Sequence, residues 1–328
     1  MRARLLLIVL ALAWNSAAQA ADPPPLTLEA KIPLGDVGGR IDHLAFDREH
    51  QLLFVAELGN DGVGVVDVRN RKVLHRLTGL KEPQGVAYHA PTSTLYVSNA
   101  GDGSVRLYQG PDFTPAGAIS LGRDADNIRF DSRRKQIVVG YGNGGLAMID
   151  PATRRKTSDI PLKAHPEGFQ FEPTGQRVFV NIPDVHSIAV VDMNVGAQTR
   201  SIDTLDARSN FPMAIDGDLH RVLSVFRSPR KLMAFGIEDG KLATSIDTCG
   251  DADDVFVDGP RNRVHVSCGE GVIDVFSVRD PDHYSMIARI KTSVGARTSL
   301  WVPELNQLFL AVPAREGQEA AIWVYSRE

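Results

Sequence analysis

The sequence predicts an all-β fold, a seven-bladed β-propeller whose ring is closed by an N-terminal strand that completes the last blade. Two observations carry this prediction. A polar loop followed by a short strand recurs at intervals of 41 to 45 residues. Each repeat before the last contains four short runs of β-branched and aromatic residues, and no segment after the first twenty residues has a sustained helical period.

The repeat is clearest in residues 124–131 and 251–258, with weaker copies in residues 40–47 and 165–172. Each copy ends in an aromatic or β-branched residue that serves as an anchor for comparing repeats. The anchors are Phe46, Tyr88, Phe130, Phe171, Ile215, Val257 and Val302. A fixed period of this length is typical of propeller blades.

The four runs of the first repeat are residues 44–46, 52–56, 63–67 and 73–77. The last repeat stops at Tyr325 after its third run, whereas residues 26–32 alternate apolar and polar side chains as a spare strand at the other end. Pairing these two ends closes the ring and removes two exposed sheet edges.

The first twenty residues have the features of a signal peptide. Arg2 and Arg4 form a basic start, the apolar run after them is too short to span a bilayer, and small residues precede a cleavage site near Ala20. We therefore expect residues 1–20 to be a signal peptide and residues 21–328 to form one propeller domain, periplasmic or secreted.

The formal net charge is −4, which argues against an extended phosphate-binding surface. No nucleic-acid partner is expected, and no later segment is apolar enough to cross a membrane. The expected partner is a small molecule or a periplasmic protein, and the expected state is a monomer.

Two segments resemble a known repeat. Residues 95–105, Leu-Tyr-Val-Ser-Asn followed by Ala-Gly-Asp-Gly-Ser-Val, are similar to the YVTN repeat of exported bacterial propellers, as are residues 63–67 leading to 72–74. The chain after residue 20 resembles the YncE-like branch of that family. The resemblance implies the propeller fold, whereas propellers carry binding, scaffolding and enzymatic functions. The usual Pro-x-Gly of the first-strand loops is kept only at residues 83–85 and 166–168.

The loops that enter the innermost strands of a propeller open on one face, around the central channel. We expect these loops to bring polar side chains from distant repeats into one concave site, the default place for a ligand. The candidate ligand-binding residues are Arg40, Asp42, His43, Gln84, Asn127, His165, Arg208, Asn210, Asp254 and Arg297.

Three carboxylates, Asp126, Glu167 and Asp253, lie four residues before their anchors and are the candidate metal ligands. Carboxylates around a narrow opening repel one another unless a cation compensates them, and oxygen ligands suit Ca²⁺ or Mg²⁺. His43 and His165 are the candidate general bases, each beside a carboxylate. The alternative is that each acidic residue caps a tight turn and faces solvent.

Three functions follow from this arrangement. The first is binding of a ligand or partner at the polar mouth. The second is a metal-dependent lactonase, hydrolase or lyase at the same mouth, which loosely resembles the metal-dependent propeller enzymes although no complete motif of theirs is present. The third is a passive scaffold for another protein.

Cys249 and Cys268 allow one disulfide in an oxidising compartment, and two unpaired thiols are the alternative.

Overall fold

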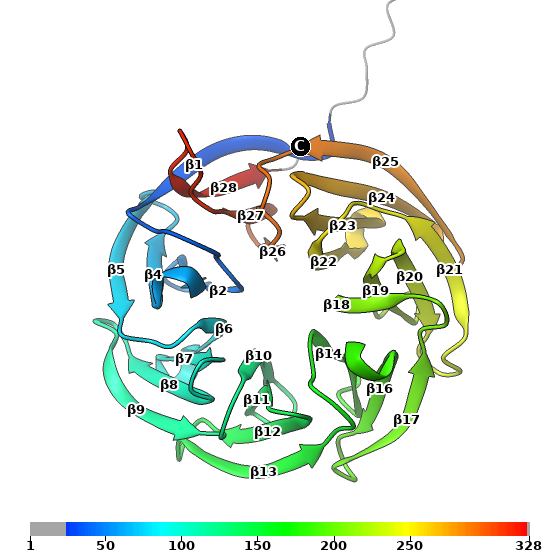
Figure 1. The fold of residues 1–328 in the computed structure, drawn as a ribbon, viewed down its shortest axis with the longest axis horizontal. Helices are drawn as coiled ribbons and strands as arrows, with labels where there is room; N and C mark the ends of the chain where they lie inside the picture. The colour runs from blue at the N-terminus through cyan, green and yellow to red at the C-terminus, as the bar shows by residue number, and fades with distance from the viewer. Residues whose placement is uncertain (1–23, 327–328) are drawn as a thin grey trace, which may run out of the picture.

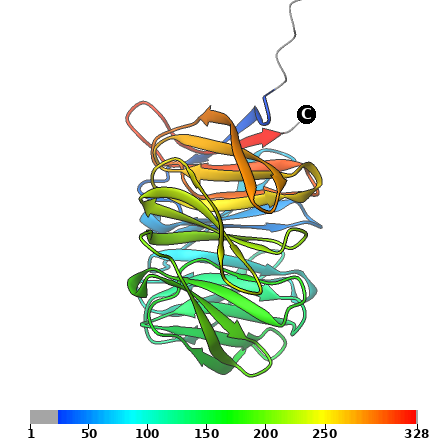
Figure 2. The same ribbon diagram turned by 90° about the vertical axis from the view of Figure 1, so that its right-hand side faces the viewer.

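A computed structural model describes residues 24–326, which form 28 β-strands and four short 3₁₀ helices. The strands make seven four-stranded antiparallel sheets, arranged as a ring in Figure 1 and seen edge-on in Figure 2. The fold is therefore the seven-bladed β-propeller that the sequence predicts. The predicted signal peptide, residues 1–20, lies outside the described residues.

The first three blades, each written from the channel outward, are β2 (Leu44–Asp47), β3 (Leu52–Glu57), β4 (Gly62–Asp67) and β5 (Lys72–Thr78); β6 (Pro83–His89), β7 (Thr94–Asn99), β8 (Ser104–Gln109) and β9 (Thr114–Ser120); and β10 (Ala125–Asp131), β11 (Gln136–Tyr141), β12 (Gly145–Asp150) and β13 (Arg155–Pro161).

The next three are β14 (Phe169–Phe171), β15 (Arg177–Ile182), β16 (Ser187–Asp192) and β17 (Ala197–Asp203); β18 (Arg208–Asp216), β19 (Arg221–Ser228), β20 (Arg230–Gly236) and β21 (Leu242–Asp247); and β22 (Ala252–Asp258), β23 (Arg263–Cys268), β24 (Val272–Asp280) and β25 (His283–Lys291). The 3₁₀ helices are η1 (Leu58–Asn60), η2 (Ala90–Thr92), η3 (Pro183–Val185) and η4 (Gly259–Arg261).

The seventh blade joins the two ends of the chain. It contains β26 (Ser299–Val302), β27 (Gln307–Val312), β28 (Ala320–Ser326) and, as its outermost strand, β1 (Thr27–Gly35). Thr27 pairs with Ser326 at the start of an antiparallel register that continues to Gly35 and Ala320. The N-terminal strand thus closes the ring as expected (Figure 1).

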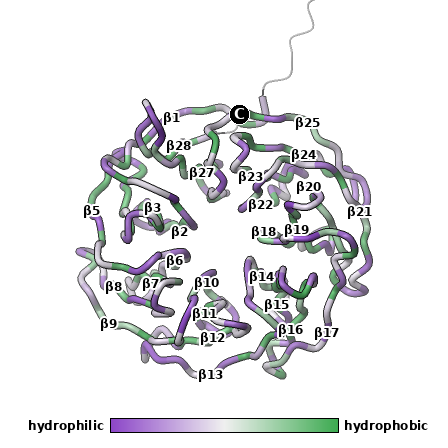
Figure 3. The backbone as a smooth tube through the Cα atoms, in the orientation of Figure 1, coloured by the Kyte–Doolittle hydropathy of each residue, from purple (hydrophilic) through white to green (hydrophobic). Residues whose placement is uncertain are grey.

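The apolar faces of neighbouring blades pack against one another. In the described chain, buried apolar side chains form seven clusters, and each draws its members from two adjacent blades; one combines Leu53 with Phe309, and another combines Leu223 with Val264. Strands in the middle of a blade are buried on both sides, which explains their continuous apolar runs. Figure 3 shows this hydrophobic colouring within the blades and hydrophilic segments beside the channel.

The anchor predicted for the last blade is wrong by one residue. In the other six blades the anchor pairs with the residue seven positions later, as Phe46 does with Leu53. In the last blade Trp301, not Val302, has this pairing, with Leu308. Trp301 and Val302 are adjacent bulky residues, so hydrophobicity alone does not show which of them occupies the repeat position.

No helix within residues 24–326 is long and apolar enough to span a membrane.

Candidate functional site

Seven side chains from one position of the repeat surround the mouth of the channel. Each lies four residues before the anchor of its blade, with Trp301 as the last anchor. The seven are Asp42, Gln84, Asp126, Glu167, Phe211, Asp253 and Arg297, and all line one cavity of about 260 Å³. The rest of the wall is formed by Arg40, His43, Asp124, His165 and Arg227. The entering loops therefore bring distant repeats together at one polar cavity.

Irregular strand pairing turns several of these side chains toward the channel. In β6, β10, β18 and β22 the inner strand has one more residue than its partner near its start. The extra segment contains Gln84, Asp126, Phe211 or Asp253, respectively. A bulge of this kind breaks the alternation of a strand and re-aims a side chain. The cavity wall is thus built from local departures from regular β structure.

Asp126, His165 and Glu167 form a compact cluster at the third and fourth blades. One ligand atom of each lies within 4.8 Å of the others. His165 Nδ1 lies 2.6 Å from the carbonyl oxygen of Gly142, which orients the ring, and Nε2 lies 3.6 Å from Asp126 Oδ2. Asp126 is 5% exposed, and its buried Oδ1 has no hydrogen-bond partner among residues 24–326. Buried carboxylate oxygens are normally satisfied, so this atom indicates a missing partner.

The cluster binds protons more tightly than isolated side chains do. Burial raises the pKa of Glu167 to about 8, and the negative charge of Asp126 adds to this rise. Burial disfavours protonated His165, but its contacts with Asp126, the Gly142 carbonyl and Asp124 outweigh that cost and raise its pKa to about 9. Protons therefore compensate the crowded carboxylates at neutral pH.

A second charged group lies at the first and sixth blades. Arg40 Nη2 donates to Asp42 Oδ2 at 2.5 Å, and His43 lies between Asp42 Oδ1 (3.7 Å) and Asp254 Oδ1 (4.0 Å). Burial raises the pKa of Asp42 to about 6 and that of Asp254 to about 7. Burial opposes the charged form of His43, but Asp42 and Asp254 outweigh it, so the pKa of His43 is also raised.

Arginines neutralise the carboxylates on the remaining side of the mouth. Arg227 Nη2 lies 2.7 Å from Asp253 Oδ1, and Arg297 Nε lies 2.9 Å from Asp253 Oδ2. Both arginines also contact Asp251, at 3.2 and 2.8 Å. The Arg227 guanidinium lies over the Phe211 ring, 4.1 Å from its centroid. Asp253, expected to be a metal ligand with Asp126 and Glu167, is instead held by two guanidiniums, and His165 takes its place in the cluster.

A narrower cavity of about 30 Å³ continues from the mouth into the channel. It shares His43, Glu167, Phe211 and Asp253 with the mouth and adds Asn127, Arg129, Gln170, Met213, Asp254 and Phe256 to its wall. Arg129 Nε is 3.3 Å from the Phe169 carbonyl oxygen, and Nη1 is 3.4 Å from that of Ile128. Burial lowers the pKa of Arg129, whereas Asp254 and Asp126 oppose that shift.

Two of the candidate ligand-binding residues line neither cavity. Arg208 Nη1 donates to the carbonyl oxygens of Leu205 and Ala207, at 2.6 and 2.9 Å. Asn210 is fully buried, and its Nδ2 donates to Asn181 Oδ1 at 3.0 Å. Both residues lie at the start of β18 (Arg208–Asp216), where the Arg208 side chain contacts the preceding loop and the Asn210 side chain contacts the neighbouring blade.

Sequence reasoning missed Phe211 and Arg129. Phe211 has the same place in its repeat as Asp126 and Glu167, but a search restricted to titratable residues passes over it. Arg129 lies one residue before the anchor Phe130, inside an expected strand. Alternation along that strand indicates that the side chain faces the channel, which is the signal that was available.

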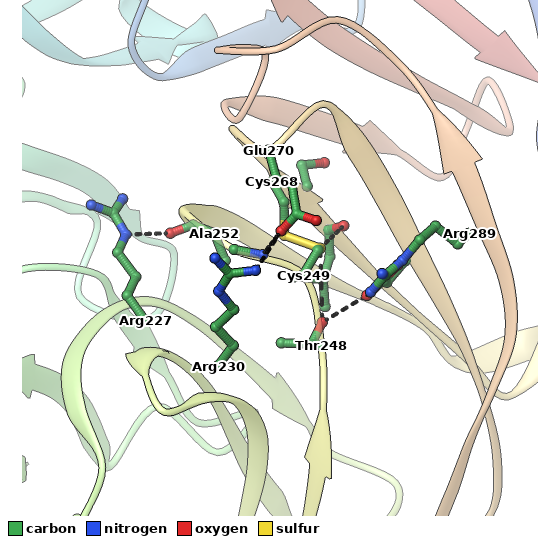
Figure 4. The surroundings of a disulfide bond; sticks show 12 residues. Arg227, Arg230, Thr248, Cys249, Ala252, Cys268, Glu270 and Arg289 are labelled. Atoms are coloured by element: carbon green, nitrogen blue, oxygen red, sulfur yellow. Dashed lines mark hydrogen bonds and ion pairs between the residues drawn. A yellow bond between two sulfur atoms is a disulfide. The ribbon is translucent and has the colours of Figure 1, made fainter.

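The structure joins Cys249 and Cys268 by a disulfide beside the loop that carries Asp251 (Figure 4). In the same loop, Gly250 N donates to Glu270 Oε2 at 2.7 Å, and Arg230 Nη1 contacts the same oxygen at 2.9 Å. The bridge and these contacts hold the loop from which Asp251 reaches Arg227 and Arg297.

Comparison with known proteins supports the fold class. No family model matches the chain, and no curated protein sequence matches it. A solved structure titled Kuenenia stuttgartiensis hydrazine synthase contains a chain that is 15% identical, with a TM-score of 0.74 over 88% of this chain and 96% of that one. A chain in a crystal structure of the mitotic checkpoint complex is 13% identical, with a TM-score of 0.76 over 97% of this chain and 99% of that one.

These identities are low, so the likeness shows the fold alone. The protein is a seven-bladed β-propeller, a class whose members serve as scaffolds for ligands or for other proteins.

Proposed function

We propose that this protein binds a divalent cation at Asp126, His165 and Glu167 and, through that cation, a small ligand in the mouth of the propeller. The observation that carries the proposal is the cluster itself. Three donor groups converge within 4.8 Å, and the buried Oδ1 of Asp126 has no hydrogen-bond partner within the described chain. A cation at this point would give that oxygen its missing partner.

The donor set selects among cations. Ca²⁺ and Mg²⁺, which the carboxylates alone suggest, prefer oxygen ligands only. One imidazole nitrogen with two carboxylates instead suits Zn²⁺, Mn²⁺ or another transition metal. The hydrogen bond from His165 Nδ1 to the Gly142 carbonyl supports this choice, because it fixes the tautomer that presents Nε2 to the cluster.

The charge of the mouth also favours a cation. Its wall contains five carboxylates against three guanidiniums, namely Asp42, Asp124, Asp126, Glu167 and Asp253 against Arg40, Arg227 and Arg297. At neutral pH the protons held by Glu167 and His165 offset this excess. A divalent cation would replace them between Asp126 and Glu167, because the arginines lie on the other blades.

The site also supports a second candidate function, a metal-dependent hydrolase. Three protein donors leave coordination positions open toward a solvent-connected cavity, as in catalytic rather than structural metal sites. His43 lines the same cavity and contacts two carboxylates, so it is available as a general base. Hydrolysis of lactones and esters by the cation-loaded protein, lost on His43→Gln with cation affinity retained, is the test of this candidate.

The disulfide supports an oxidising compartment, in agreement with the predicted signal peptide. We therefore place the proposed site outside the cytoplasm. Mass measurement of the protein recovered from the periplasm of an expressing bacterium tests this directly, since cleavage near Ala20 leaves a defined mass.

The experiment for the main proposal is calorimetric titration of the chelator-treated mature protein with Zn²⁺ and Mn²⁺. One tight site is expected in the wild type, with an affinity weakened about 100-fold or more by Asp126→Asn or His165→Gln. Asp159→Asn is the matched control, because Asp159 is an acidic residue on the outer strand β13, paired with Lys156. Equal affinities in all four proteins, or no binding in the wild type, would refute the proposal.

A further inference from the structure

Arg129 differs from the three arginines of the mouth. Arg40, Arg227 and Arg297 each have a carboxylate oxygen within 3.2 Å. Arg129 has none within 4.0 Å in the part of the chain described, and its two hydrogen bonds to carbonyl oxygens are long, at 3.3 and 3.4 Å. Arg129 itself is half-buried and lines the narrow cavity. The guanidinium of Arg129 therefore lacks the carboxylate partner that each of the three mouth arginines has.

The space beside Arg129 is small and suits a compact group. The narrow cavity has a volume of about 30 Å³, its apolar wall includes Met213 and Phe256, and it opens into the mouth through shared residues. Asn127 also lines it. A carboxylate fits a site of this size better than a bulkier anion does.

The carboxylates on the same wall are engaged elsewhere. Asp254 Oδ2 accepts a hydrogen bond from the Ser299 amide at 2.7 Å, and its Oδ1 lies 4.0 Å from His43 Nδ1. Asp253 is held by Arg227 and Arg297. The cation proposed above occupies Glu167. No carboxylate of this wall thus occupies the N–H donors of Arg129, and these donors can bind an incoming anion.

We propose that the ligand of the mouth is a small organic carboxylate, whose carboxylate binds Arg129 while its other end lies beside Asp126, His165 and Glu167. Guanidinium and carboxylate groups match in geometry and bind through paired, charge-assisted hydrogen bonds. The part of this inference that concerns the outer end of the ligand rests on the proposed cation site. The anion-binding site at Arg129, called the anion seat below, does not depend on the cation site.

The test compares glycolate with glycolamide, its neutral analogue of equal size, by titration of the Zn²⁺-loaded mature protein. Glycolate is expected to bind and glycolamide to bind far more weakly. Arg129→Gln should weaken glycolate binding about 10- to 100-fold, because a hydrogen bond to a charged group is lost. Zn²⁺ affinity should be unchanged, and Arg129→Lys should retain part of the glycolate affinity. Arg155→Gln, an exposed arginine of β13 in the same blade, is the control.

Acetate added to the cation-free protein separates the two proposals. Acetate binding that depends on Arg129 in a protein that binds no Zn²⁺ would retain the anion seat and refute the cation site. Glycolate binding that requires Zn²⁺ but is unaffected by Arg129→Gln would retain the cation site and refute the anion seat. If Arg129→Gln melts below the assay temperature, the carboxyl resonance of ¹³C-labelled glycolate is measured with the wild type and with Arg129→Lys instead. A resonance that does not shift on binding to either protein would overturn the inference.

Discussion

The mouth of the channel has two sides that are built from the same position of the repeat but differ in how their charges are satisfied. Asp253 in the sixth blade has a guanidinium at each carboxylate oxygen. Asp126 in the third blade has no arginine within 4.0 Å among the described residues, and its basic contact is His165 Nε2 at 3.6 Å. The difference shows that a ring of acidic residues is not one site, because guanidiniums of the chain balance one side, whereas protons that a cation can replace balance the other.

The largest expected effect is the pH dependence of cation binding, which concerns only the side with Asp126. A cation must displace the protons of His165 and Glu167, whose pKa values are raised to about 9 and about 8. Affinity should therefore fall as pH falls, by up to about 100-fold per pH unit between pH 8 and pH 6, where two protons are released on binding. Titration calorimetry in buffers of different ionisation enthalpy counts these protons, and an affinity independent of pH would contradict the assignment.

Removing the disulfide tests the side with Asp253. Cys249→Ser with Cys268→Ser opens a loop with a sequence separation of 19 residues, which should lower the free energy of unfolding by about 3 kcal/mol. Urea denaturation of the variant and of the wild type measures this loss. Zn²⁺ affinity should stay unchanged, since the cluster lies across the mouth; a parallel loss of affinity would mean that the two sides act as one unit.

The sharpest comparison exchanges the two equivalent aspartates for asparagine in the cation-free protein. Asp253→Asn removes a negative charge that two guanidiniums share, and should destabilise the fold by about 1–3 kcal/mol. Asp126→Asn should cost less than Asp253→Asn, because the partner of Asp126 is one imidazole, with His165 Nε2 3.6 Å away, and Asp126 also lies close to other carboxylates. Thermal or urea unfolding of both variants decides, and equal losses would show that the two positions are satisfied alike.

The smallest expected effect is at Arg40, whose side chain is 44% exposed. Arg40→Gln should lower the free energy of unfolding by less than about 1 kcal/mol, because solvent around the half-exposed guanidinium screens its attraction to buried Asp42. The pKa of Asp42, raised by burial to about 6, should rise further, since Arg40 is one of the charges that hold it down. An NMR titration of the Asp42 carboxyl carbon measures that shift, and a fall in this pKa would contradict the interpretation.

Much of the fold was predictable because it depends on local pattern. The number of blades follows from the spacing of the repeats, and the closure by β1 follows from counting strands. The error at Trp301 arose where two adjacent bulky residues made the local pattern ambiguous, and the pairing of β26 with β27 resolves it.

The candidate site was predictable in part. The loops that enter the inner strands converge in any propeller. The sequence could therefore predict that Asp42, Asp126 and Glu167 line the mouth. The positions of Arg208 and Asn210 could not be predicted, because they depend on contacts with the preceding loop and with the neighbouring blade, which the local pattern does not contain.

By itself the sequence determined the seven blades, the strand that closes them and the set of polar loops at one face, since repeat spacing and strand alternation are properties of neighbouring residues. Only the tertiary structure decided that Asp253 is held by two guanidiniums and Asp126 by one imidazole, and that Arg129 has no carboxylate oxygen within 4.0 Å among residues 24–326. The reason is physical: the charge on a side chain is compensated by whatever lies within a few ångströms in space, and in this ring those neighbours come from blades far apart in the chain.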